Sequence, residues 1–271
     1  MNNDMNMEQV DLLVSRGMSL ASAQAVVQEA IERAPHRLDL WGVEVRALPR
    51  ENRLAAVKAA YDQRRSLWER AGVEPDAILQ AVAALDPGDA DAMLRTARLL
   101  AESSEKRKAQ GDADAVAKEL SWIADILVYQ LAQAPPPQET RGRLLVAVGR
   151  AYLAAARWDA AERLLRDAIP LLSGAERGAA LAHCSEALAA MRKPAKALET
   201  AEEAARMLPA NAAVRLNYAR RLRDAGRVAE ARFEYRALME QHRGDRIESV
   251  AQQRRQTDTV EYGRFLRNRA T

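Results

Sequence analysis

The stretch VGRAYLAAARWDAAERLLRDAI, residues 148–169, decides the fold of this chain. Gly149 lies inside a run of helix-forming residues, where glycine costs about 1 kcal/mol relative to alanine. Tyr152 follows three residues later, and the small residue Ala161 lies twelve residues after the glycine. A glycine at such a place needs a packing reason, because its intrinsic preference works against the helix.

The same pattern returns twice further along the chain. A small residue lies early in the second helix of each copy, at Ala161, Ala197 and Ala231, so the copies are 36 and 34 residues apart. Another small residue lies twelve positions before each of these, and a large one nine positions before, namely Gly149, Ser185 and Ala219, and Tyr152, Leu188 and Leu222. An internal repeat of this length indicates a solenoid built from helix pairs.

These residues resemble the tetratricopeptide repeat family, whose unit is a helix–turn–helix of 34 residues. Gly149, Tyr152 and Ala161 match its signature, Ala197 and Pro209 match it in the next unit, and Gly226 stands at its turn position. The units are about 142–175, 178–211 and 212–245. The resemblance implies an all-α fold, a right-handed α-solenoid of antiparallel helix pairs with a C-terminal capping helix. In such a fold the helices of a unit would approach closely at Gly149 and Ala161.

Three regions are expected along the chain. Residues 1–134 form a helical region of divergent TPR-like pairs, or a helical domain of their own. Residues 138–245 hold the three units, and residues 246–271 form a capping helix and a basic tail. Apolar residues at spacings of three and four, separated by prolines, predict these helices: 7–16, 20–33, 37–48, 51–71, 75–85, 89–110, 112–133, 139–155, 158–171, 174–190, 194–207, 212–225, 228–242 and 246–268.

Helix ends carry their own signals. Ser173 with Glu176, and Asp245 with Glu248, are capping-box patterns, and Asn211 and Asp112 are predicted N-caps. Pro170 lies late in a predicted helix and should bend or end it.

Composition favours a helical globular protein of the cytoplasm. Of 271 residues 48% are hydrophobic and 29% charged, with only 4% aromatic. Neither a secretory signal nor an apolar run long enough to cross a bilayer is seen, so no membrane insertion is expected. Cys184 is the one cysteine, which rules out an intramolecular disulfide.

The resemblance also implies a binding groove, since ligands of this family contact defined positions of each first helix. These positions are Arg143, Val146, Ala147, Arg150, Leu153 and Ala154, then Ala179, Ala182, His183, Glu186, Ala189 and Ala190, then Ala213, Leu216, Asn217, Arg220, Arg223 and Asp224. The predicted groove residues are Arg143, Arg150, His183, Glu186, Leu216, Asn217, Arg220 and Arg223. Arginine can bind carboxylates with two parallel hydrogen bonds, so the expected ligand is an acidic or amphipathic segment of another protein. Taken singly, Arg150, Arg220 and Arg223 are each better explained as solvated side chains, and it is the group that favours a binding role.

One partner class is excluded on residue type. Co-chaperones of this family bind the acidic end of heat-shock chaperones through lysine and asparagine residues at set positions. Val146 and Arg150, and Ala213 and Asn217, stand at those positions here, so that clamp is not reproduced.

The sequence predicts neither a catalytic site nor a cofactor or metal. His36, His183 and His242 belong to different segments, and Cys184 occupies an apolar repeat position that favours a buried thiol. The acids of Asp89-x-Asp91 and Asp112-x-Asp114 open helices, where capping is their expected role.

The leading hypothesis is therefore a non-catalytic adaptor or assembly subunit, with an enzyme the least favoured reading. Residues 212–271 contain 14 Arg and no Lys against 8 acidic residues, a net charge of +6. This predicts a basic C-terminal face that would meet an acidic surface, made of Arg254, Arg255, Arg264, Arg267 and Arg269. The alternative is RNA binding through the same face, because a basic stripe is the usual electrostatic footprint of nucleic-acid binding.

Overall fold

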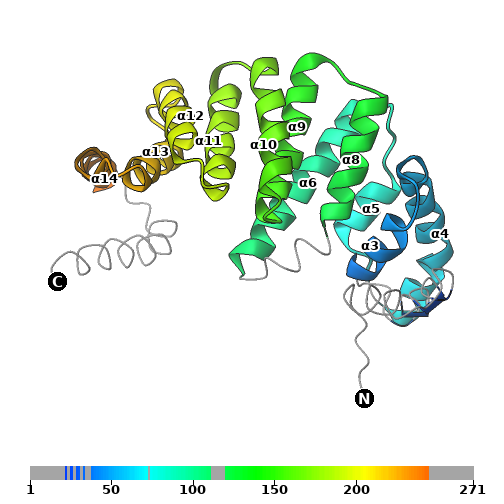
Figure 1. Cartoon of the computed structure of the whole chain (residues 1–271). Coiled ribbons are helices and arrows are strands. Elements are labelled where there is room, and N and C mark those ends of the chain that lie inside the picture. Colours follow the sequence, from blue (N-terminus) through cyan, green and yellow to red (C-terminus); the bar gives the residue numbers. More distant parts are fainter. Residues whose placement is uncertain are drawn as a thin grey trace.

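The chain is seen in a computed structural model that describes residues 38–72, 74–110 and 120–243, with a few single positions between 22 and 33. All regular structure in these ranges is helical (Figure 1). The α-helices are α3 (Leu38–Arg46), α4 (Arg53–Ala71), α5 (Ala77–Ala83), α6 (Ala90–Ala109), α8 (Ser121–Gln133), α9 (Gln138–Ala154), α10 (Trp158–Ala168), α11 (Gly174–Ala190), α12 (Pro194–Met207), α13 (Ala212–Asp224) and α14 (Val228–Arg243). Two 3-10 helices, η1 (Arg50–Asn52) and η2 (Ile169–Leu171), complete the set.

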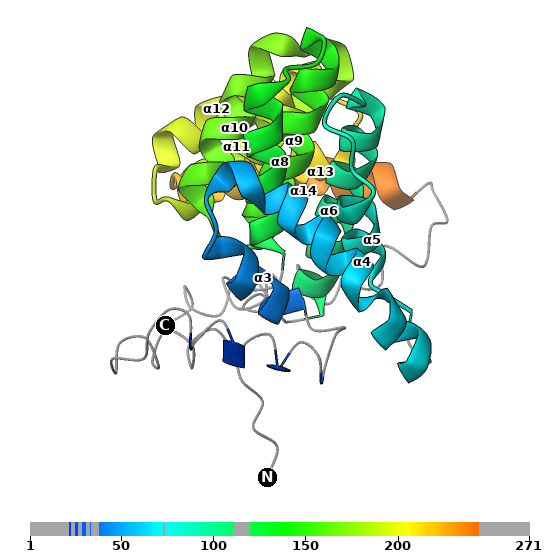
Figure 2. The same cartoon turned by 90° about the vertical axis from the view of Figure 1, so that its right-hand side faces the viewer.

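The helices follow one another along an arc and pack as neighbouring pairs, so the predicted all-α, TPR-like solenoid is confirmed. The pairs α9–α10, α11–α12 and α13–α14 lie in chain order along the arc of Figure 1. Figure 2 looks along the arc, with α3 and α4 nearest the viewer. Helices predicted at 7–16 and 246–268, the caps at Asp112 and Asp245, and the five arginines of the basic face lie outside the described residues.

The repeat positions are buried in all three units. Ala161, Ala197 and Ala231 are at most 2% exposed. Their partners earlier in each unit, Gly149, Ser185 and Ala219, and Tyr152, Leu188 and Leu222, are buried as well. The spacing read from the sequence therefore gives the inward-facing side of each helix.

Gly149 gives space to a side chain. A Cβ atom at Gly149 would lie 2.8 Å from Cγ of Leu165, on α10. The close neighbour of the glycine is thus Leu165, not Ala161 as the sequence suggested. A second glycine–leucine contact of this kind lies near the start of α11, where a Cβ at Gly178 would lie 2.7 Å from Cγ of Leu208.

The turn between the two helices of each unit uses one left-handed residue. Ala156, Arg192 and Gly226 have φ angles of 56°, 57° and 80°. The next residue in each turn donates its N–H to the carbonyl five positions back, at 2.8–2.9 Å: Arg157 to Tyr152, Lys193 to Leu188 and Arg227 to Leu222. This pattern ends the first helix and reverses the chain in each unit. Glycine suits it best, yet only Gly226 supplies one.

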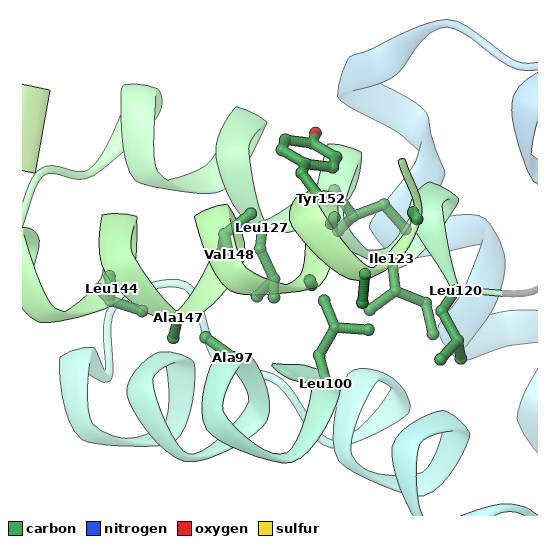
Figure 3. Packing of buried hydrophobic residues seen from close by; sticks show 14 of the residues in the cluster. Ala97, Leu100, Leu120, Ile123, Leu127, Leu144, Ala147, Val148 and Tyr152 are labelled. Atoms are coloured by element: carbon green, nitrogen blue, oxygen red, sulfur yellow. The ribbon is translucent and has the colours of Figure 1, made fainter. Parts of the chain in front are cut away.

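The helices before the repeats share their core. One cluster of buried residues runs from Leu38 to Ala197 and includes Trp41 and Trp122. The Trp122 indole donates to the Leu38 carbonyl at 3.2 Å, which joins α8 to α3. Figure 3 shows residues of α6, α8 and α9 in this cluster, with Ala97 and Leu100 of α6 facing α9. The core beside the later units is smaller and consists of Leu181, Ala182, Ala204 and Val214.

Most predicted helix ends are confirmed. The side chain of Asn211 accepts from the N–H groups of Ala213 and Val214, and Asp89 caps α6 in the same way. Pro170 ends α10 as predicted, because the chain passes into η2 after Ala168. The helix predicted to begin at Gly174 does begin there, with Ser173 as its N-cap residue, but the Ser173 hydroxyl makes no capping hydrogen bond.

A bilayer-spanning helix would need a long apolar stretch, and none of the described helices has one.

Candidate functional site

The first helices of the units, α9, α11 and α13, carry the predicted groove residues. Arg143 on α9 is engaged in ion pairs: its Nε donates to Glu176 at 2.8 Å, and Nη2 donates to Glu139 at 2.6 Å. The hydrogen bond and charge of Glu176 raise the pKa of Arg143. Arg143 therefore joins α9 to the start of α11, and this pairing uses the carboxylate that the capping box required.

Arg150 is also paired within the protein. Its Nε and Nη2 donate to the two carboxylate oxygens of Glu105 on α6, at 2.8 and 2.7 Å. The hydrogen bond with Glu105 raises the pKa of Arg150, and the charges of Glu102 and Glu186 add to it. A bidentate pair of this kind fixes the position of α6 beside α9.

Helix α6 occupies the side of α9 that the sequence assigned to the groove. Ala147, Leu153 and Ala154 are buried, and Figure 3 shows Ala147 close to Ala97 of α6. The first unit consequently offers little open floor. Of the predicted groove positions, those on α11 and α13 remain to be considered.

Asn217 lies inside the protein rather than in the groove. Its side chain is buried, and Nδ2 donates to the Ala182 carbonyl at 2.9 Å and to the Ser185 hydroxyl at 3.1 Å. Both acceptors belong to α11, so Asn217 holds α13 against the preceding unit. The prediction of a ligand contact at Asn217 does not fit this placement.

The remaining predicted residues, His183, Glu186, Leu216, Arg220 and Arg223, stay at least partly exposed on α11 and α13. We call these five the inner surface. His183 Nδ1 lies 3.8 Å from Glu186 Oε2, and Arg223 Nη2 donates to Asp224 at 3.1 Å.

Glu186 carries negative charge at the centre of this surface. Burial opposes its charged form, but the nearby His183, Lys108 and Arg221 outweigh burial and hold the pKa of this carboxyl below its ordinary value. The carboxylate therefore keeps its charge in slightly acidic solution.

The comparison with protein families agrees with this geometry. The sequence model described as "Tetratricopeptide repeat" matches residues 188–253. Residues 188–253 therefore carry the tetratricopeptide repeat pattern. The match begins at the end of α11, covers the helices α12, α13 and α14, and reaches ten residues beyond Arg243. None of the curated proteins compared with the chain matches it significantly.

One feature of the tetratricopeptide repeats escaped the sequence analysis. A pocket of about 270 Å³ lies between the turn of the second unit and α13, lined by Ala189, Arg192, Pro194, Ala197, Arg221 and Asp224. We call it the turn pocket. Sequence offered no sign of it, because Arg192 occupies the turn position that Ala156 and Gly226 hold in the other repeats.

The repeats also bury the one cysteine. Cys184 is 4% exposed, and burial raises the pKa of its thiol to about 11. A neutral, enclosed thiol is a poor nucleophile. Across the described ranges, no group of three or more His, Cys, Asp or Glu side chains is placed to hold a metal ion.

Proposed function

We propose that this protein is a non-catalytic interaction subunit that binds an acidic or amphipathic segment of a partner protein along the inner surface. Tetratricopeptide repeats generally mediate protein–protein interaction, and solenoids present extended surfaces for it. The proposal is narrower than that general role, because it assigns the contact to α11 and α13.

The arginines of α13 carry the proposal. Arg220, Arg221 and Arg223 lie within one turn, with Asp224 as the acidic side chain beside them. Arg143 and Arg150 on α9 are bound to carboxylates of other helices. We therefore assign the contact with the partner's carboxylates to the third unit, at Arg220 and Arg223.

A displayed library of random peptides tests the proposal. Peptides selected on the wild-type protein should be rich in Asp and Glu, and the double variant Arg220→Glu/Arg223→Glu should bind them at least tenfold more weakly. A matched control, Arg163→Glu/Arg166→Glu, makes the same charge change on exposed residues of α10. It should bind the peptides as the wild type does.

Circular dichroism and thermal unfolding of both variants show whether the fold survives. Equal weakening by the two double variants would reveal a general charge effect and contradict the proposal. Selected peptides without acidic residues would contradict it too. The basic face proposed for RNA lies outside the described residues, so no structural observation favours that alternative.

A further inference from the structure

The turn pocket contains a buried guanidinium with incomplete hydrogen bonding. The side chain of Arg221 is 14% exposed, and its Nη1 lies 3.3 Å from Asp224 Oδ2. Its Nε is buried and has no hydrogen-bond acceptor. Asp224 therefore satisfies only part of the hydrogen-bonding capacity of this guanidinium.

Burial disfavours the charged form of Arg221. Burial holds the pKa of Arg221 below the ordinary value of arginine, and the like charges of Arg220 and Arg223 act in the same direction. Asp224 and Glu186 oppose this shift without cancelling it. A further negative group beside Arg221 would stabilise its charged form.

Arg192 adds a second cation to the lining of the pocket. It is exposed and forms no ion pair with any residue that the structure describes. Its place in the turn is set by the backbone, whose φ of 57° is unfavourable for a residue with a side chain. The pocket therefore has two guanidinium groups against the single carboxylate of Asp224.

Half of the residues that line the pocket are apolar, namely Ala189, Pro194 and Ala197. Methylene groups fit against such a lining, whereas a free phosphate ion would leave it uncovered. The volume of about 270 Å³ is enough for one side chain of a bound segment. A glutamate side chain combines both requirements, with two methylenes and a terminal carboxylate.

We propose that the turn pocket binds a glutamate side chain of the partner segment, whose carboxylate pairs with the guanidinium groups of Arg221 and Arg192. This inference rests on the proposed function, because the inner surface brings the segment to the pocket. The pocket adjoins the inner surface in sequence on both helices. On α13, Arg221 follows Arg220 and Asp224 follows Arg223. On α11, Ala189 lies three residues after Glu186.

Arg192→Gly is the most informative variant. It removes a guanidinium at a position where glycine relieves the unfavourable φ, so the fold should be retained. Lys193→Ser is the matched control: it removes one positive charge from the neighbouring exposed residue, which does not line the pocket. Arg221→Lys keeps the charge but removes the planar guanidinium that binds a carboxylate through two hydrogen bonds.

Binding is measured with a peptide selected from the library and with versions in which each Glu is replaced by Gln. At one position of the peptide, replacement of Glu by Gln should weaken binding to the wild-type protein about tenfold. Arg192→Gly and Arg221→Lys should weaken the Glu peptide to a similar degree and leave the Gln version unchanged. Lys193→Ser should stay within twofold of the wild type.

The outcomes separate the two proposals. One outcome would overturn the pocket proposal alone. In it, peptide binding is lost in Arg220→Glu/Arg223→Glu, but the affinities for Arg192→Gly and Lys193→Ser are equal. Absence of peptides that depend on the inner surface would overturn the proposed function. N-acetylglutamate methylamide, titrated while the Arg221 Nε–H signal is followed by NMR, tests the pocket without a partner. Inorganic phosphate shifting that signal as strongly, or no shift with the glutamate compound, would contradict a glutamate site.

Discussion

Ala156 and Arg192 adopt a backbone conformation that costs about 1–2 kcal/mol for a residue with a Cβ atom. Gly226 takes the same position in the third unit without that penalty. The turn geometry is the same in all three because the hydrogen bond that closes it is the same. The helix pair therefore enforces the turn, and the residue in it adapts.

Ala156→Gly should consequently stabilise the protein by about 0.5–1 kcal/mol, since relief of the left-handed strain exceeds the entropy that glycine adds to the unfolded chain. Ala156 is exposed, so no packing is lost. Urea unfolding measures the change. Ala155→Gly, one residue earlier and with φ of −80°, is the control and should be destabilising.

Cys184 should make stability depend on pH in alkaline solution. Its thiol titrates near 9 when unfolded and near 11 when folded, so between these values the unfolded state releases a proton that the folded state keeps. Release of protons on unfolding means that stability falls as pH rises through this window. The difference in urea midpoint between wild type and Cys184→Ala, followed from pH 8 to pH 10.5, isolates this contribution from other titrating groups. A constant difference would show that the thiol titrates normally.

At the scale of elements, side chains placed against glycines fix how two helices of a unit meet. Gly149 accommodates Leu165, and a larger side chain there has no free space. Gly149→Leu should destabilise the protein by about 1–3 kcal/mol through overpacking. In a Leu165→Ala background the same substitution should be less harmful, because the truncated side chain leaves room. Additive effects of the two substitutions in thermal unfolding would contradict this contact.

Asn217 connects α13 to α11 through two buried hydrogen bonds. Asn217→Ala should destabilise by about 1–3 kcal/mol, because the acceptors at Ala182 and Ser185 lose a buried partner. Urea unfolding gives the loss. Asn211→Ala, which removes the N-cap of the same helix, serves as a reference and should cost about 1 kcal/mol. If Asn217→Ala and Asn211→Ala cost the same free energy of unfolding in a Ser185→Ala background, the Ser185 hydroxyl would be the partner of Asn217 that matters.

Helix positions were largely predictable from sequence, whereas some helix ends were not. Apolar periodicity and prolines are local signals, so the spans of α9 to α14 and the stop at Pro170 came close to the observed ones. Ser173 and Glu176 have the spacing of a capping box, yet Arg143 on another helix binds the carboxylate. A local motif fails where a distant residue competes for the same group.

At the scale of the whole molecule, the sequence could not predict how α6 lies along α9. This placement depends on Glu105 meeting Arg150 and on Ala97 meeting Ala147, residues about 45 to 50 positions apart. Family positions suggested an open groove over all three units, but packing against α6 closes its first part. The turn pocket was equally hidden, because it forms between a turn and a helix of different units.

The core continuous from Leu38 to Ala197 should make local stability uneven. Amides of α8 and α9 should exchange with deuterium most slowly, and those of α13 and α14 faster, because the small cluster beside them buries less apolar surface. Hydrogen exchange followed by mass spectrometry measures this gradient. A bound acidic peptide should slow exchange in α13 while leaving α10 unchanged. Uniform exchange along the arc would contradict the gradient.

The closures at Gly142 against Leu172 and at Gly178 against Leu208 are built alike and lie 36 residues apart. Each closure joins the first helix of a module to the end of that same module. A tandem duplication of residues 142–177 would therefore carry its own closure with it. Such a longer chain should keep the helix pairs intact while extending its reach toward a partner, and circular dichroism and thermal unfolding of the duplicated variant would test this.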